Sequence, residues 1–458
     1  MAVRDEGAKR HGPECHRAET SAVQRAFLGE TTETLEPANE KELAEVVRWA
    51  ESQQQPLIPS GHGAHAFLGN PAGKKSTIVS LRRLNQVLRY EPDDFTVGVQ
   101  AGVPLAELRK TLHAKRQEIA LDHARQAPGT IGGLVATERP GPRRGRFGPV
   151  RSSIIGIHSL RGGPSQYKAG GMVVKNVAGY EVARFLAGSF GTAGFLTEIN
   201  FKLRPLPERR SMRVAAFSDP NAAWQLAKQL RAQHLEPAAL TIVSAGAIGE
   251  LGELLASHQP PDDTLRLAVW LFEGSTESVT WQEAQVDTLF AKLGADSRVS
   301  PPLPDENVDS VYDFLCQFGE FPSTVPDDQG CARLGVLPGA ASELETRVLG
   351  VGESTPRVPA ATFGAVTDAL TGLSTARWQA SPNDVTGPVR PLTEAALSLQ
   401  GTGVLLYLPP AQRPQWQYLL VPDRNRELAT KILKVFDPTR VFAPGRLHGS
   451  SSEGASGA

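Results

Sequence analysis

Residues 170–205 of this 458-residue chain read GGMVVKNVAGYEVARFLAGSFGTAGFLTEINFKLRP, and the rest of the fold can be read outward from them. Within the stretch, Val182, Phe185 and Leu186 fall on one side of a short predicted helix. Glycines at 188, 191 and 194 end that helix and permit tight or left-handed backbone.

A strand follows these glycines. Residues 195–204 alternate in side-chain direction, and Pro205 ends the alternation. A loop without side chains between a helix and a strand lets backbone approach a flat or phosphorylated ligand closely. Taken alone, however, the stretch favours a plain helix-to-strand turn over a ligand site.

The composition is that of an ordinary globular protein, with 40% hydrophobic residues, 21% charged residues and a formal net charge of −1. The length suffices for two or three domains with substantial cores. The balanced charge gives no sign of a nucleic-acid partner. No segment approaches the roughly 18 consecutive apolar residues of a membrane helix, and residues 1–20 lack the apolar core of a secretory signal. We expect a cytoplasmic protein without nucleic-acid partner or direct membrane span.

The cysteines and histidines predict no metal site. Cys15, Cys316 and Cys331 are far apart and form no CxxC pair. They are too few and too scattered for an iron–sulfur cluster or a four-cysteine zinc site. The three histidines after residue 201 are also far from one another in sequence.

The periodicity predicts α/β layers. The first part shows a βαβ-like order, with helices expected over 40–54 and 104–115, and strands over 56–59, 77–80 and 96–101. A change of texture after Pro205-Leu-Pro207 marks a domain boundary. Beyond it we expect helices over 220–234, 247–256, 276–293 and 307–318, and strands over 212–217, 238–243, 264–272, 331–337, 374–379 and 403–408. Residues 340–372 and 380–400 receive no assignment.

Two more glycine-containing loops precede the opening stretch. The first, SGHGAHAFLG at 60–69, follows a predicted strand, and such a loop can cradle pyrophosphate through its backbone N–H groups. It is not GxGxxG and lacks the acidic residue of a Rossmann domain, which disfavours nicotinamide binding. The second is PGTIGG at 128–133. His62 and His65 have no cluster of further metal ligands, which favours polar loop histidines.

The segment 139–151 carries five arginines. They form either a solvated face or a surface that receives an anion or an acidic partner. For Arg143, Arg144 and Arg146 we favour a surface facing a partner or a phosphate over a catalytic role.

The ordered set of motifs resembles the FAD-binding domain of the vanillyl-alcohol oxidase / p-cresol methylhydroxylase superfamily. The pieces GPRRGRFGPVR (141–151), GGMVVKNVAGY (170–180) and FDPTRVFAPGRL (436–447) look more narrowly like the FAD-binding subunits of bacterial glycolate oxidase. The resemblance covers 27–209 and 430–447, and is thin between them.

This resemblance implies an α+β fold in five segments. They are a flexible tail (1–26), a two-subdomain p-cresol methylhydroxylase-type FAD-binding domain (27–209), an α/β cap-like second domain (210–427), a segment returning to the FAD domain (428–447), and a disordered tail (448–458).

The resemblance also implies which residues bind FAD. A pyrophosphate loop, a second flavin-facing loop and an adenine-facing strand start are expected. Their residues are Pro59, Ser60, Gly61, His62, Gly63, Ala64, His65, Pro128, Gly129, Thr130, Gly132, Gly133, Gly194, Phe195 and Leu196.

Lys175 is a further candidate, because a lysine near a flavin can stabilise negative charge on the reduced ring. The alternative role, fixing its loop by bonds to backbone carbonyls, is favoured. Some relatives attach FAD covalently through a histidine in a Gly-Gly-His-Ser loop. Here His62 stands one place early and no serine follows, so we expect non-covalent FAD.

The catalytic residues of the hydroxy-acid dehydrogenases in this superfamily are missing. The chain has neither their GDGNxH-type motif nor their later Glu-His pair, so catalytic residues are not assigned. We expect an FAD-binding subunit of a glycolate oxidase/dehydrogenase complex, with a catalytic flavoprotein subunit and an iron–sulfur subunit as partners. Membrane association would arise only through those partners. The alternatives are an assembly subunit with a degenerate flavin site and a stand-alone sugar-acid or alditol oxidase.

Overall fold

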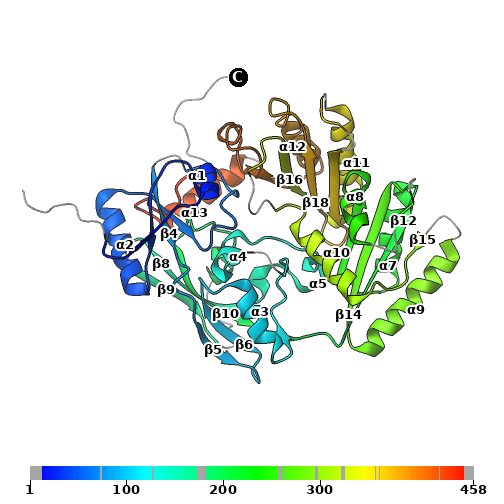
Figure 1. The fold of residues 1–458 in the computed structure, drawn as a ribbon, viewed down its shortest axis with the longest axis horizontal. Helices are drawn as coiled ribbons and strands as arrows, with labels where there is room; N and C mark the ends of the chain where they lie inside the picture. The colour runs from blue at the N-terminus through cyan, green and yellow to red at the C-terminus, as the bar shows by residue number, and fades with distance from the viewer. Residues whose placement is uncertain are drawn as a thin grey trace, which may run out of the picture.

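The computed structural model describes residues 13–72, 75–125, 128–163, 165–172, 182–255, 260–261, 264–293, 298–320, 325–355, 357–359, 362–421 and 423–447. Three larger sheets with helices packed on them build these parts of the molecule (Figure 1). Two of the sheets form the N-terminal half, and the third forms the C-terminal half.

The first sheet has four strands in the order β1-β2-β4-β3. Its elements are β1 (His16–Ala18), α1 (Ala22–Leu28), β2 (Thr31–Glu36), α2 (Glu40–Gln53), β3 (Leu57–Ser60) and β4 (Ser76–Ser80). β4 runs parallel to β2 and β3, as the βαβ-like order predicts. α2 begins after Asn39, whose side chain accepts hydrogen bonds from the first free N–H groups of the helix.

The second sheet is antiparallel, with the order β5-β6-β10-β8-β9. Its elements and neighbours are β5 (Val87–Glu91), β6 (Thr96–Gln100), α3 (Leu105–His113), β7 (Gln117–Glu118), α4 (Ile131–Thr137), α5 (Arg144–Phe147), β8 (Ile154–Arg161), β9 (Ser165–Gly170), α6 (Val182–Leu186), β10 (Phe195–Lys202) and β11 (Arg204–Pro205). The predicted strand at 195–204 is confirmed as β10, the central strand. Ile199 and Phe201 on it are fully buried.

The third sheet has nine strands in the order β15-β12-β14-β13-β17-β18-β16-β19-β20. Its strands are β12 (Arg209–Phe217), β13 (Ala239–Ser244), β14 (Arg266–Gly274), β15 (Arg298–Val299), β16 (Gln329–Gly335), β17 (Phe363–Asp368), β18 (Leu373–Gln379), β19 (Thr402–Tyr407) and β20 (Leu419–Leu420). Its helices are α7 (Pro220–Ala232), α8 (Ala245–Leu254), α9 (Thr276–Leu293), α10 (Asp305–Gln317), α11 (Ala341–Ser354) and α12 (Val389–Ser398).

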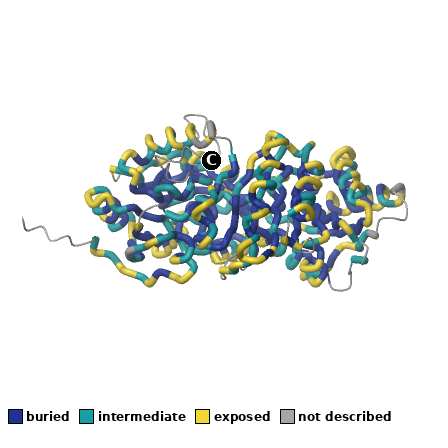
Figure 2. Tube along the Cα trace, turned by 90° about the horizontal axis from the view of Figure 1, so that it is seen from above, coloured by how far each residue is buried: buried dark blue, intermediate teal, exposed yellow. Residues whose placement is uncertain are grey.

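The two ends of this sheet are covered differently. Along β14, Trp270 packs towards α7 and α9, and its neighbour Leu271 packs towards α8 and α10. Along β16, Ala332 packs with α11 and α12. The opposite face of β16 and β19 carries Cys331 and Tyr407, which pack against Phe67 of the N-terminal half. The C-terminal half therefore lies directly on the loop that follows β3, and buried residues continue through this junction (Figure 2).

The C-terminal helix α13 (Asp423–Phe436) leads back to the first sheet. The N–H of Leu57 donates to the carbonyl of Val441 over 2.7 Å, and the N–H of Ala443 donates to the carbonyl of Leu57 over 2.7 Å. Phe442 between them is 1% exposed. The last residues of the described chain thus pair with the start of β3.

The expectation of a flexible tail over 1–26 is wrong from residue 13 onward, because β1 and α1 lie there. Ser21 and Gln24 form a capping box that begins α1, and β1 pairs antiparallel with β2. The unassigned segments contain α11, β17 and α12. The expected disordered tail at 448–458 lies outside the described residues.

No helix in the described part of the chain is long and apolar enough to cross a membrane.

Candidate functional site

The loop after β3 offers a run of free backbone donors. The carbonyl of Ser60 still accepts from the N–H of Leu81, over 2.9 Å. Beyond it, none of the backbone N–H groups of residues 61–65 donates a hydrogen bond to another described residue. Successive unpaired N–H groups in one loop form a concave site for an anion. This loop can therefore hold a pyrophosphate through backbone alone.

The segment 128–133 has a different role, because the N–H groups that begin α4 are already used. Oγ1 of Thr130 accepts from the N–H of Gly133 over 3.2 Å, and the N–H of Gly132 donates to the carbonyl of Ala101 over 2.7 Å. This segment contributes to the site by the close packing that its glycines allow. A Cβ on Gly132 would lie 2.7 Å from that of Ala101, so only glycine fits there.

These two glycine loops touch each other. A Cβ on Gly61 would lie 2.3 Å from Oγ1 of Thr130, and one on Gly133 would lie 3.9 Å from Nδ1 of His65. A side chain at position 61 would force the loops apart. The glycine is thus required by the contact between the loops as well as by any ligand.

The glycines of the opening stretch complete the same region. Gly191 has φ +71°, and a Cβ on it would lie 2.5 Å from Cγ of Pro59. Gly194 has φ +125°, and a Cβ there would lie 2.5 Å from the carbonyl oxygen of Leu160. Both positions combine positive φ with a close neighbour, so glycine is required. They bring the start of β10 beside the end of β3.

Most of the predicted site residues share one cleft. Those that line it are Pro59, Ser60, Gly61, His62, Gly63, Ala64, His65, Gly129, Thr130, Gly132, Gly133, Gly194 and Leu196. Pro128 is not in the lining, and Phe195 is fully buried with its ring 5.5 Å from that of Phe442. Lys175 lies outside the described residues.

Arg446 is not among the predicted site residues, yet it also lines the cleft. Its guanidinium donates to the carbonyl oxygens of Asn70 over 2.6 Å and Ala66 over 3.2 Å, and also to that of Leu68. Burial lowers the pKa of Arg446 to about 9. The end of the chain thereby fixes the loop after β3. The C-terminal motif contains this arginine, but nothing in it identifies the carbonyls that the side chain binds.

The two loop histidines are neutral at neutral pH. Burial, followed by the charge of Arg139, lowers the pKa of His65 to about 3. Burial and the charge of Arg82 lower the pKa of His62. In the described ranges, no group of three or more His, Cys, Asp or Glu residues could hold a metal ion.

Three arginines, Arg139, Arg333 and Arg413, lie around Tyr418, and we call them the arginine cluster. Arg139 and Arg413 are buried and Arg333 is half-buried. None of the three is among the residues that line the cleft. Nη1 of Arg139 lies 2.8 Å from Oε1 of Glu320. Burial, followed by the charge of Arg139, lowers the pKa of Arg333 to about 10. The guanidinium of Arg413 lies 5.8 Å from the ring of Tyr418.

The arginine cluster has more positive charge than its protein partners neutralise. Nη2 of Arg413 donates to the carbonyl of Gly69 over 3.1 Å. Its Nε and Nη1 are buried and have no hydrogen-bond partner among the described residues. Burial lowers the pKa of Arg413 to about 10. Buried cations without a counter-charge are costly.

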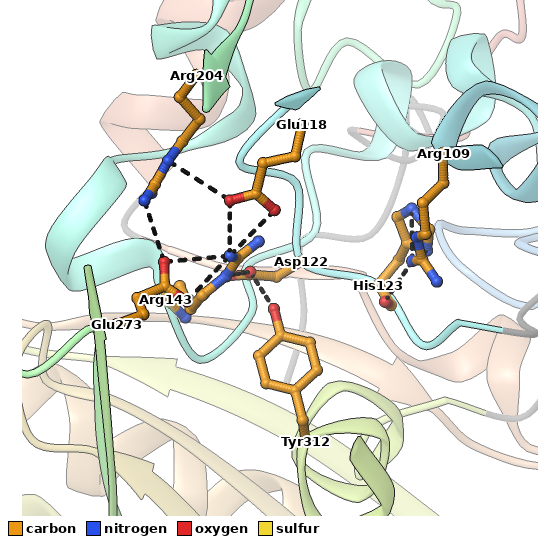
Figure 3. Close-up of polar contacts among 8 residues, drawn as sticks. All are labelled: Arg109, Glu118, Asp122, His123, Arg143, Arg204, Glu273 and Tyr312. Carbon is orange, nitrogen blue, oxygen red and sulfur yellow. Dashed lines mark hydrogen bonds and ion pairs between the residues drawn. The ribbon is translucent and has the colours of Figure 1, made fainter. Parts of the chain in front are cut away.

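The arginine-rich segment does not form the predicted surface at Arg143. That side chain is 8% exposed and lies in the network of Figure 3. Its Nε is 2.9 Å from Asp122, and its Nη1 is 3.2 Å from Glu118 and 3.3 Å from Glu273.

The rest of the network joins the two halves. Arg204 also contacts Glu118 and Glu273, over 3.4 and 3.3 Å, and the hydroxyl of Tyr312 donates to Asp122. The prediction of a partner- or phosphate-facing surface is wrong for Arg143, because carboxylates of the chain itself surround its guanidinium.

Two comparisons of sequence bear on this site. Residues 33–162 match the family described as FAD binding domain. Glycolate oxidase subunit GlcE of Escherichia coli is 33% identical over 190 residues, which cover 40% of this chain and 54% of that one. Glycolate oxidase subunit GlcD of Bacillus subtilis is 27% identical over 206 residues, covering 45% and 44%. The chain thus spans about half the length of these curated relatives.

The fold is also found in solved structures. A crystal structure of p-cresol methylhydroxylase with substrate bound superposes with a TM-score of 0.70 at 15% identity, covering 93% of this chain and 90% of that one. The expected α+β fold of p-cresol methylhydroxylase type, with a second domain, is confirmed. Residues 33–162 are thus similar to the FAD binding domain family, and less than half of the chain is homologous to parts of the two glycolate oxidase subunits.

Proposed function

We propose that this protein is the FAD-binding flavoprotein subunit of a glycolate, or related 2-hydroxy-acid, oxidase/dehydrogenase complex. One observation carries the proposal: three glycine stretches, at 59–65, 129–133 and 191–194, converge on a single cleft. The cleft combines free N–H groups with apolar ends, as a diphosphate between two ring systems requires. The homology to the glycolate oxidase subunits supports the complex and its substrate class.

The residues fit the cofactor in the following way. The N–H groups of 61–65 would bind the pyrophosphate, and Gly194 and Leu196 would lie against the adenine end. Bound FAD supplies a two-electron acceptor that can pass electrons on singly. In some relatives a histidine in a Gly-Gly-His-Ser loop attaches FAD covalently. Here no serine follows His62, so the attachment is non-covalent in this proposal.

In this complex the subunit supports oxidation of glycolate to glyoxylate, and its electrons pass to an iron–sulfur subunit. A catalytic flavoprotein subunit supplies the groups that act on the hydroxy-acid, since the GDGNxH-type motif and the Glu-His pair are missing from this sequence. We place the complex in the cytoplasm, held at a membrane only through partner subunits.

The arginine cluster favours a second candidate function, in which this chain itself turns over a small organic acid. A carboxylate suits two buried guanidinium nitrogens that lack partners. The discriminating measurement is turnover of glycolate with an artificial electron acceptor, by the isolated chain and by the chain co-expressed with its partner subunits. Activity in the complex alone supports the subunit role, and activity of the isolated chain supports the second candidate.

A flavin spectrum tests the cofactor. The purified full chain, reconstituted with FAD if necessary, is expected to show flavin absorbance that acid precipitation releases into the supernatant. Flavin that stays with the precipitate would contradict non-covalent attachment. A chain that carries no flavin and binds no added FAD would overturn the proposal and leave an assembly subunit.

A further inference from the structure

A second pocket, separate from the cofactor cleft, lies between the two halves of the molecule. Its volume is about 440 Å³, within the usual range of small-molecule sites. It is lined by α3 and residues 118–125 from the N-terminal half, and by Arg210, Glu273 and α10 from the C-terminal half. We call it the junction pocket.

One wall of the junction pocket is apolar. The residues that form it are Leu105, Leu108, Leu112, Ile119, Leu121 and Ile131. They come from the buried side of α3, from the segment after β7 and from the first residue of α4. An apolar wall of this kind favours a ligand with a hydrocarbon body.

The rest of the lining is largely polar, and its arginines are paired with one exception. Arg125 lies 2.5 Å from Asp309 and 3.1 Å from Asp313. Arg210 lies 2.8 Å from Asp309, and Arg143 is held in the network of Figure 3. These cations are neutralised within the protein and offer little to a ligand.

Arg109 is the exception. Among the described residues it has no carboxylate partner within ion-pair distance, and all its hydrogen bonds come from Nη2. That nitrogen lies 2.7 Å from Nδ1 of His123 and 3.2 Å from the carbonyl oxygen of His123. Nε and Nη1 remain for a ligand. Burial, which is the largest cause, lowers the pKa of Arg109, and the nearby Tyr312 and Asp313 offset only part of this effect.

His123 orients Arg109 without neutralising it. Burial, followed by the charge of Arg109, lowers the pKa of His123 to about 4, so the ring is neutral at physiological pH. Its Nδ1 also lies 2.9 Å from the carbonyl oxygen of Ala124, and Nε2 lies 3.2 Å from Nη2 of Arg109. Figure 3 shows this pair apart from the carboxylates that surround Arg143. A guanidinium held on one side by a neutral group keeps its positive charge available on the other side.

We propose that the junction pocket binds a singly charged organic carboxylate with an apolar body, and that Arg109 holds its carboxylate. Two N–H groups on one guanidinium match the two oxygens of a carboxylate. Glu118, Glu273 and Asp309 line the same pocket and would repel a dianion such as phosphate about twice as strongly as a single carboxylate. The proposal goes beyond the flavin function and does not depend on it, because Arg109 and the apolar wall do not line the cofactor cleft.

Calorimetric titration of the full chain with hexanoate tests the proposal, with hexanamide as a neutral ligand of the same shape. Hexanoate is expected to bind about tenfold or more tightly than hexanamide. Arg109→Gln is expected to remove that preference. Arg48→Gln, on the exposed side of α2, is the matched control and should bind as the unaltered chain does.

Three results would overturn the proposal: no hexanoate binding, equal affinity for hexanoate and hexanamide, or full hexanoate affinity in Arg109→Gln. The comparison of the two ligands uses the unaltered chain, so it stands even if Arg109→Gln does not fold. Flavin content, measured on the same samples, separates this outcome from a failure of the flavin function.

Discussion

Gly61 and Thr130 meet so closely that a Cβ on residue 61 would lie 2.3 Å from Oγ1 of Thr130. One residue belongs to the loop with free N–H groups and the other caps α4. Their contact makes a single wall from two loops that are far apart in sequence. Packing therefore helps to position the free donors of 61–65, together with the hydrogen bonds that the carbonyls of Gly61, Gly63 and His65 accept.

Gly61→Ala is expected to push the two loops apart and to lower flavin content in the purified chain. Overpacking of this kind costs about 1–3 kcal/mol of stability. The control is Gly249→Ala, because a Cβ on Gly249 in α8 meets nothing within 4 Å. Flavin absorbance per chain and urea unfolding check both variants. Unchanged flavin content in Gly61→Ala would show that the loop does not hold the cofactor.

Arg446→Met is expected to loosen the loop after β3 from the C-terminal end of the chain. The carbonyls of Ala66, Leu68 and Asn70 would lose a buried donor. Each buried acceptor left without a partner costs about 1–3 kcal/mol, so the unfolding midpoint in urea should fall strongly. FAD, if added in excess, should restore part of the lost stability, because a bound ligand stabilises the folded state. Equal stability of variant and unaltered chain would contradict this role.

Arg143→Met tests the network between the halves. The change leaves Asp122 without its cation and leaves Glu118 and Glu273 with Arg204 alone. Breaking a buried ion pair in this way typically costs about 3–5 kcal/mol. Arg146→Gln is the control from the same motif. Arg146 pairs with Glu236 at the exposed surface, where a pair contributes about 1 kcal/mol or less. Unfolding in urea should separate the two variants clearly, and equal losses would mean that the network is not stabilising.

The sequence predicts well whatever depends on local pattern. The alternating side-chain pattern of residues 195–204 predicts β10. The glycines at 191 and 194 have positive φ, and the atoms next to them leave no room for a side chain. The capping box of Ser21 and Gln24 was also present in the sequence. Charged and polar residues dominate the region before it, and they favour the prediction of a flexible tail, which is wrong from residue 13 onward.

The burial of Arg143 among carboxylates could not be predicted from the sequence. A run of arginines looks the same whether water or buried carboxylates surround it. The deciding partners lie far away in the chain, and Glu273 comes from a strand of the other half. The contacts of Arg446 could not be predicted either. Its partners are backbone carbonyls, which every type of residue carries. Long-range electrostatic pairing depends on the tertiary fold, which periodicity does not reveal.

The pH dependence of stability should reveal the buried state of His123. Its pKa is about 4 in the folded chain against an ordinary 6.5. As the pH falls from 6.5 towards 4, the unfolded chain takes up a proton that the folded chain does not, so stability falls over that window. At about pH 5 the loss from this group is about 2 kcal/mol. Above 6.5 the group contributes no pH dependence.

His123→Asn removes this titration while keeping a side chain that can accept from Arg109. The difference in unfolding free energy between about pH 7 and about pH 5 should therefore be smaller in the variant by about 2 kcal/mol. Asp368, whose pKa burial raises to about 6, acts in the opposite direction, but it is present in both proteins and cancels. Equal pH dependence in the two proteins would mean that His123 titrates normally, and hence that Arg109 does not face a neutral partner.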